Sequence, residues 1–259
     1  MAGYLTLLVE RKGKVGVITL NRPEKFNTFN SAMASELNEA LIKMEEDPEV
    51  RAVIVKGAGK VFSTGIALGE FGGKTEEEYR DWMRLMDRMH LTIAEMGKPV
   101  IAMVHGYAVA NGAGLMAAAD FAVAAEGTRI GTTAINVGLL CTGPLSSLVN
   151  SLGKKKALEM LLGGEMIDAR EAERLGLVNR VVQKERLEEE TLEFAQKLVE
   201  KSPIALAEGK RFYYRAIDMP LRERLELNSE VIARLCMTGD AMEGVDAFRS
   251  KRMPSWKGA

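Results

Sequence analysis

The chain has 259 residues, of which 47% are hydrophobic and 27% are charged. It is therefore long enough to bury the core of one α/β domain with a helical appendage. Its 35 basic residues nearly cancel its 36 acidic ones, and this balance implies no nucleic-acid or membrane-surface partner. The two cysteines, Cys141 and Cys236, are far apart and have no neighbouring histidine. This spacing predicts neither a disulfide framework nor a metal site.

The N-terminal residues include a Glu, an Arg and a Lys before any apolar run is long enough for a signal peptide. No segment approaches the roughly 20 apolar residues that a membrane-spanning helix needs. We therefore expect a cytoplasmic protein that has no membrane partner.

The first half of the chain alternates between strand and helix patterns. The expected elements are hairpin strands over Tyr4–Glu10 and Val15–Leu20, a helix capped by Ser31 and ending near Asp47, a strand over Ala52–Gly57, a helix over Glu76–Met96 and a strand within Pro99–Val104. Such alternation predicts parallel βαβ units in which helices cover the sheet. The fold class is therefore α/β, with a layered core.

The second half is different, because from about Leu145 onward the pattern is almost wholly helical. Asp168 and Glu171 form a capping-box pattern at the start of a short helix. Gly176 lies where that helix is expected to stop.

Two glycine-containing loops, Val61–Leu68 and Gly106–Leu115, each follow a predicted buried strand. The second leads into a helix of small residues over Met116–Asp120. Such an arrangement gathers unpaired backbone N–H groups and the positive end of a helix dipole, which together stabilise negative charge. A single loop of this kind often does no more than permit a tight turn. Neither loop matches the common nucleotide-phosphate motifs.

Seven segments carry a more specific pattern. They are Asn21-Arg22-Pro23 with Lys25, Phe62–Gly65, Lys98–Ala102, Gly106–Asp120, Leu162–Glu165, Ala172 to Val178, and Glu243–Arg252. Their order and spacing, from about residue 5 to residue 256, resemble the crotonase (enoyl-CoA hydratase/isomerase) family. The resemblance implies a ββα superhelical core over residues 1–195. It also implies a helical C-terminal region over residues 196–259 that covers the site and assembles homotrimers, commonly paired into homohexamers.

The resemblance also implies an acyl-CoA thioester as the ligand, with coenzyme A as part of the substrate and no other cofactor. By position, the backbone amides of Ile66 and Asn111 would form the oxyanion hole that stabilises a thioester enolate. The positions expected to contact coenzyme A are Lys25, Thr64, Ile66, Phe248 and Lys251.

The chain departs from the family where hydratases carry two glutamates that move protons. Those positions fall on Gly114 and Ala134, and neither residue can transfer a proton. Asp87 is the candidate replacement, because it lies on the helix that lines the acyl pocket in this family. His90, one turn along the same helix, is a comparable candidate, and Glu70 and Cys141 are weaker ones.

Two hypotheses follow from this departure. The chain is a lyase or isomerase of fatty-acid metabolism that forms an enolate with a different acid/base and is not an efficient standard hydratase. Alternatively, it is a non-catalytic or nearly inactive homologue that binds acyl-CoA or acts as a scaffold. Retention of both loops favours the first hypothesis, whereas loss of both glutamates favours the second.

Overall fold

A six-stranded sheet runs through the body of the molecule in the computed structural model, which describes residues 3–258. The strand order is β1-β2-β3-β4-β6-β9, with β1 antiparallel to β2 and every other neighbouring pair parallel. The strands are β1 (Leu7–Lys12), β2 (Val15–Leu20), β3 (Ala52–Gly57), β4 (Val100–Val104), β6 (Phe121–Ala125) and β9 (Arg180–Val182). The predicted parallel α/β core is therefore present.

The first strand of the N-terminal hairpin begins and ends later in the chain than predicted. Strand β1 begins at Leu7 rather than Tyr4 and continues to Lys12, which pairs with Val15. Only Gly13 and Lys14 remain for the turn, and Gly13 has a φ of +62°. A two-residue hairpin turn requires such a positive φ, so the glycine fixes where the turn lies.

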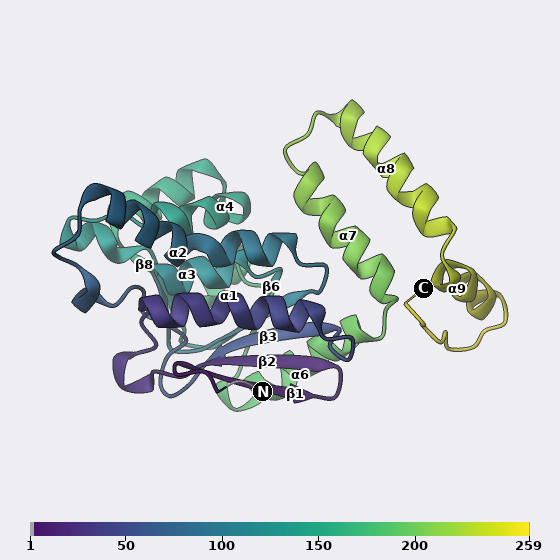
Figure 1. Cartoon of the computed structure of the whole chain (residues 1–259), viewed down its shortest axis with the longest axis horizontal. Coiled ribbons are helices and arrows are strands. Elements are labelled where there is room, and N and C mark those ends of the chain that lie inside the picture. The colour runs from purple at the N-terminus through teal and green to yellow at the C-terminus, as the bar shows by residue number, and fades with distance from the viewer. Residues whose placement is uncertain (1–2, 259) are drawn as a thin grey trace.

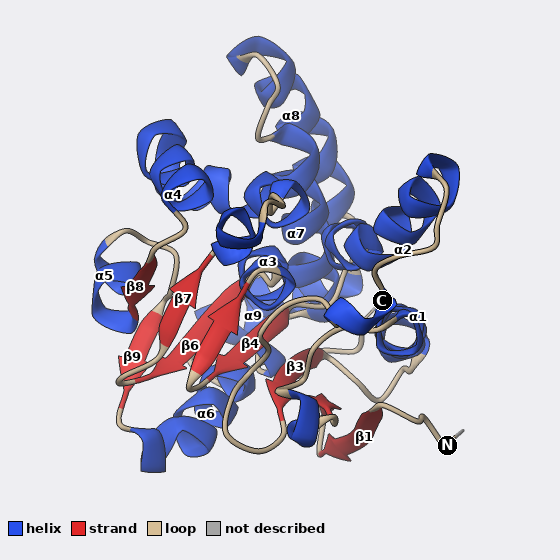
Figure 2. Ribbon diagram, turned by 90° about the vertical axis from the view of Figure 1, so that its left-hand side faces the viewer, coloured by secondary structure: helices blue, strands red, loops and turns tan. Residues whose placement is uncertain are grey.

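Helices cover both faces of the sheet (Figure 2). The helices α1 (Ser31–Glu46), α2 (Glu76–Glu95) and α3 (Asn111–Ala118) enclose the larger core cluster, and α6 (Leu187–Val199) packs on the opposite face. Burial on both faces explains why β2, β3 and β4 are nearly continuous apolar runs.

The helix starts depend on local side-chain caps. Asn30, not Ser31, caps α1, because its side chain accepts a hydrogen bond from Met33 N at 2.9 Å. The prediction of Ser31 as the cap was wrong by one residue. Thr75 and Glu78 form a full capping box at the start of α2.

The later chain contains strands that the sequence pattern did not predict. Strands β5 (Tyr107–Val109), β7 (Arg129–Gly131) and β8 (Met166–Asp168) form a second sheet, and β8 and β9 interrupt the region expected to be helical. Helix α4 (Thr142–Gly163) is broken by a non-helical Gly153. Asp168 caps α5 (Ala169–Arg174) by accepting from Glu171 N at 2.9 Å, and Gly176 follows its end with a φ of +80°.

The last three helices, α7 (Pro203–Ala216), α8 (Leu221–Cys236) and α9 (Gly239–Arg249), form an arm that projects from the body (Figure 1). The arm is joined to the core where Lys210 Nζ lies 2.6 Å from Asp120 Oδ2 and Tyr214 donates to Asp120 Oδ1 at 3.0 Å. Asp120 thus has a structural role, since it holds the arm against the core. The division between residues 195 and 196 remains a prediction. None of the helices within residues 3–258 is long and apolar enough to cross a membrane.

Candidate functional site

The two glycine-containing loops lie against each other along their backbones. Ser63 forms a parallel bridge with Ala108, since Ser63 N donates to Tyr107 O at 3.1 Å and Val109 N donates to Ser63 O at 2.9 Å. Gly112 packs so closely that an added Cβ would lie 2.3 Å from Ser63 O. A side chain at position 112 would therefore separate the loops.

The second loop ends in a strained residue that directs the start of α3. Ala110 has φ +49° and ψ −119°, a conformation that costs a non-glycine residue about 1–3 kcal/mol. Helix α3 begins at Asn111, five residues before the predicted start at Met116, so Gly112 and Gly114 are helical rather than part of a loop. The Asn111 N–H therefore belongs to the unpaired first turn of a helix.

The amides of Ile66 and Asn111 lie on neighbouring segments. A Cβ added to Gly65, which has a φ of +101°, would lie 2.8 Å from Ala110 Cβ and 3.8 Å from Asn111 N. Among the described residues, neither the Ile66 N–H nor the Asn111 N–H donates to a turn or loop carbonyl. Two such free donors, side by side at a helix N-terminus, can together bind one oxygen that carries negative charge.

A cavity of about 650 Å³ opens beside these donors. Five of the seven predicted site residues line it: Lys25, Thr64, Ile66, Asp87 and Asn111. The rest of the wall is mostly apolar, with contributions from Leu68, Phe71, Met83, Val137, Leu139 and Leu140. A concave apolar cavity with a few converging polar groups is typical of a small-molecule site.

Phe248 and Lys251 are not part of this cavity. Phe248 lies on α9 of the arm, and its side chain is 86% exposed. Lys251 follows the end of α9. In a single chain, Phe248 and Lys251 therefore lie apart from the other residues that are expected to contact coenzyme A.

Asp87 is the one carboxylate among the residues that line the cavity. Its Oδ1 is buried and has no hydrogen-bond partner within residues 3–258. Burial raises the pKa of Asp87 to about 6, because the charged form loses hydration there. A carboxyl group with this pKa can exchange a proton near neutral pH.

The glycine at position 143 makes room for that carboxylate. A Cβ added to Gly143 would lie 2.2 Å from Asp87 Oδ1, so the first turn of α4 packs directly on the acid. Sequence reasoning missed this residue. The only local signal was Gly143-Pro144 at the start of a helical pattern, and nothing in it indicates a contact with residue 87.

Gly114 and Ala134, to which the resemblance assigns the hydratase glutamate positions, lie in different surroundings. Ala134 lines the cavity, and its side chain is too short to reach across it. Gly114 lies in α3, where an added Cβ would be 3.1 Å from three atoms of Pro144. Pro144 therefore occupies the space into which a side chain at position 114 would extend.

The weaker candidates have structural partners or unfavourable chemistry. Glu70 accepts hydrogen bonds from Ser31 N and Ser31 Oγ and lies 3.2 Å from Trp82 Nε1, so it stabilises the start of α1. Burial raises the pKa of the Cys141 thiol, which disfavours the reactive thiolate. No group of three metal-ligating side chains occurs among residues 3–258.

Comparisons with known proteins show the family and the fold of the chain. Residues 10–259 match the family model described as enoyl-CoA hydratase/isomerase. A probable enoyl-CoA hydratase of Rhizobium meliloti is 36% identical over 98% of both chains. The mitochondrial enoyl-CoA hydratase domain-containing protein 3 of Xenopus laevis is 35% identical over 97% of this chain and 86% of its own.

A similar structure has also been solved. The enoyl-CoA hydratase of Mycobacterium smegmatis superposes with a TM-score of 0.94 and 39% identity, covering 97% of this chain and 98% of its own. Both the sequence relatives and this structure extend over nearly the whole molecule, including the arm. The chain therefore belongs to the enoyl-CoA hydratase/isomerase family and has the crotonase fold.

Proposed function

We propose that the protein binds acyl-CoA thioesters and converts them through an enolate, with Asp87 as its acid/base. The observation that carries this proposal is the pair of unpaired amides at Ile66 and Asn111, beside a cavity whose one carboxylate is Asp87. Amides fixed in this way can contribute several kcal/mol to the stability of a developing oxyanion.

A single carboxylate restricts the reaction. Hydration in this family uses one group to activate water and a second to deliver a proton, whereas Gly114 and Ala134 supply neither. One base near the α-carbon suffices to remove a proton from that carbon and return it to another carbon of the same substrate. The arrangement therefore favours double-bond isomerisation or another enolate reaction over efficient hydration.

The test is exchange of the α-protons of butyryl-CoA with solvent in D₂O, followed by NMR. We expect the wild-type rate to rise with pH through about 6, since the base must be deprotonated. Asp87→Asn should lower the rate by roughly 10²–10⁴-fold. Its affinity for butyryl-CoA in calorimetry should stay within a few-fold of wild type.

A non-catalytic acyl-CoA-binding homologue is the second candidate, and Gly114 with Ala134 is the observation that favours it. The same experiment separates the two. Binding without exchange in the wild-type protein would support the second candidate, whereas absence of binding to a panel of acyl-CoAs would contradict both. Hydration of crotonyl-CoA at roughly 1–10³ per second would contradict the restriction to one-carboxylate chemistry.

We also propose that a homotrimer or homohexamer completes the coenzyme A site. Lys25 lies at the cavity, while Phe248 and Lys251 lie on the arm of the same chain, away from it. An arm that reaches the cavity of a neighbouring copy would bring the three residues together. The exposed apolar side chains of the arm, which include Met237, Met242 and Phe248, support such a contact.

A further inference from the structure

A second hollow lies on the other side of Asp87. It is a groove of about 970 Å³ between α1, α2 and the start of α4. Met83, Asp87 and Gly143 line both this groove and the acyl cavity. Since the Asp87 carboxylate packs against Gly143, the acid is part of the wall between the two spaces. It can therefore meet substrate on one side and solvent on the other.

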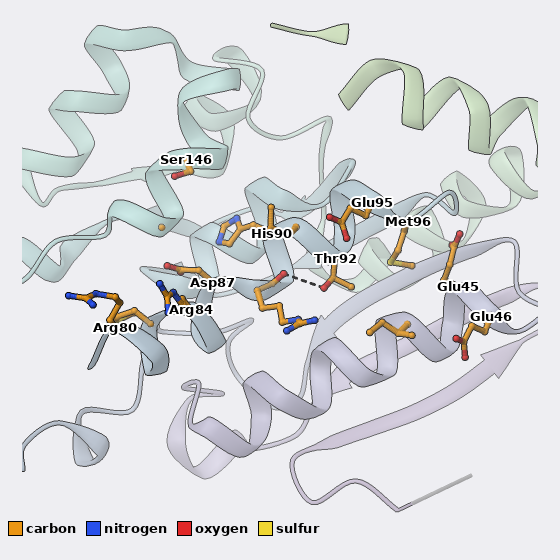
Figure 3. A pocket seen from close by; sticks show the side chains of 15 residues that line it. Glu45, Glu46, Arg80, Arg84, Asp87, His90, Thr92, Glu95, Met96 and Ser146 are labelled. Atoms are coloured by element: carbon orange, nitrogen blue, oxygen red, sulfur yellow. Dashed lines mark hydrogen bonds between the residues drawn. The ribbon is translucent and has the colours of Figure 1, made fainter. Parts of the chain in front are cut away.

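His90 lies one helical turn further along α2 and also lines the groove (Figure 3). Its Nδ1 is 2.7 Å from Ser147 Oγ on α4, which fixes the plane of the ring. Residues spaced by three in a helix have their Cβ atoms roughly 5–6 Å apart. The imidazole and the Asp87 carboxylate are therefore neighbours on one side of α2.

These two side chains share an unusual property. Asp87 Oδ1 and His90 Nε2 are both buried, and neither has a hydrogen-bond partner within residues 3–258. Buried polar atoms are nearly always paired with protein or with ordered water. A water molecule between the two atoms would satisfy both at once.

We infer that Asp87 and His90 form a proton relay, in which His90 carries protons between the catalytic carboxyl group and the solvent of the groove. The inference rests on the function proposed above for Asp87 and adds the route by which that acid exchanges its proton. His90 would act through Asp87 and would not touch the substrate.

The protons balance along this route. Asp87 takes a proton from the α-carbon and becomes a neutral acid, leaving the electron pair in the enolate. The acid gives its proton to the bridging water, which passes one to His90 Nε2. We assign the Nδ1–H of His90 as the donor to Ser147 Oγ, so Nε2 is the free acceptor. The imidazolium then gives its Nδ1 proton to Ser147 Oγ while the serine hydroxyl passes its own proton to solvent, and the return of a solvent proton reverses the steps.

The surroundings keep the imidazole neutral. Burial lowers the pKa of His90 to about 4, so the ring is neutral at pH 7. The charged groups that line the groove are Arg80, Arg84, Arg88 and Glu95 from α2 and Glu45 and Glu46 from α1. The Cys141 thiol, just before α4, lies on the cavity side. The imidazolium is only a transient carrier, because its pKa lies about two units below that of Asp87.

The relay is tested by chemical rescue of the His90→Ala variant. The reporter is loss of deuterium from α-deuterated butyryl-CoA in H₂O, measured by mass spectrometry. Without His90, Asp87 should return the same deuteron to the substrate more often, so that exchange falls about tenfold or more. Free imidazole should enter the open groove and restore exchange with saturation. Imidazole should not accelerate the wild-type protein or the control variant Leu91→Ala, which shortens an exposed groove residue.

His90→Gln separates the relay from a structural role. Glutamine can still hydrogen bond to Ser147 but cannot carry a proton, so this variant should exchange as slowly as His90→Ala. Wild-type exchange in His90→Gln would overturn the relay, and so would a slow His90→Ala protein that imidazole does not restore. Failure of the proposed function looks different. In that case either the wild-type protein shows no exchange, or Asp87→Asn exchanges as fast as the wild-type protein.

Discussion

At the scale of single residues, the space left by Gly143 determines where the Asp87 carboxylate lies. In Gly143→Ala the new Cβ would lie 2.2 Å from Oδ1, so the carboxylate must turn away from α4. We expect α-proton exchange to fall by about 10–100-fold while acyl-CoA affinity changes little, because displacement of an acid/base by about 1 Å is costly. Calorimetry and exchange on the same preparation measure both quantities. Unchanged exchange would show that Asp87 need not rest on Gly143.

The same carboxylate makes the stability of the protein depend on pH. The folded state raises the pKa of Asp87 from 3.8 to about 6, so folded protein binds the proton more tightly than unfolded protein. This group therefore lowers stability as pH rises from about 4 to 6, and the loss remains at higher pH. After allowance for partial exposure the effect is about 1–2 kcal/mol.

Asp87→Asn should therefore stabilise the protein at pH 7.5 and have little effect near pH 4. The expected rise in melting temperature at pH 7.5 is roughly 2–6 °C. Differential scanning fluorimetry at both pH values provides the measurement. Equal melting temperatures of the variant and the wild type at pH 7.5 would mean that the carboxylate is better solvated than its burial indicates.

Sequence reasoning found some of these residues and missed others for a physical reason. Ile66 and Asn111 were identified through the family resemblance, because the glycine-containing segments around them carry it; Ile66 lies in the first loop and Asn111 begins α3. Asp87 could be predicted to lie on a helix, but its environment depends on Gly143, 56 positions later in the chain. Contacts between distant segments leave no periodic signal in a single sequence.

At the scale of elements, the packing of α3 on α4 decides whether hydration can be engineered. A positive φ at Gly114 would oppose a glutamate there. In the structure Gly114 is helical without a positive φ, and the obstacle is Pro144, 3.1 Å from an added Cβ. A side chain at this position must displace the first turn of α4.

We therefore expect the double variant Gly114→Glu with Ala134→Glu to be destabilised and to hydrate crotonyl-CoA poorly. Adding Pro144→Ala removes Cγ, one of the three contacting atoms, and frees the backbone of the turn, so it should ease the contact and raise hydration severalfold over the double variant. Loss of absorbance of the conjugated thioester measures the rate. The control Gly114→Ala with Pro144→Ala contains the packing change without a carboxylate. Efficient hydration by the double variant alone would show that α4 moves readily.

Element prediction was reliable for long periodic segments and unreliable for short ones. Helix α2 was predicted to within one residue because charges and apolar residues recur over five turns. Strands β8 and β9 have three residues each, too few to show an alternating pattern, and they were predicted as helix. Their positions are set by pairing with β7 and β6, which only the folded chain provides.

At the scale of the whole molecule, the arm of α7, α8 and α9 leaves apolar surface uncovered. Leu221, Leu225, Ile232, Met237, Met242, Val245 and Phe248 are large apolar side chains of the arm that are exposed in the single chain. An apolar surface of this kind is typical of an interface. The match to solved relatives extends over the arm, so its direction agrees with theirs.

We expect light scattering at micromolar concentration to give the mass of three or six chains of 28.4 kDa. Phe248→Asp should weaken acyl-CoA binding by about tenfold and leave the melting temperature of the body nearly unchanged, because the side chain touches little of its own chain. Arg249→Asp, a charge change at the neighbouring position of α9, is the matched control. A monomeric mass with full acyl-CoA affinity would contradict the shared site.

The bridge between Ser63 and Ala108 has a consequence for how this fold can change over generations. It holds the two amides proposed as donors together through main-chain bonds, so the proposed activation of a thioester would depend on the backbone and not on the side chains of the cavity wall. The surrounding positions are then free to vary, and a new reaction needs only a new acid or base at the edge of a constant anion site. Randomising Ala67, Ala134 and Leu140 together should yield many proteins that still bind thioesters but differ in the products they release.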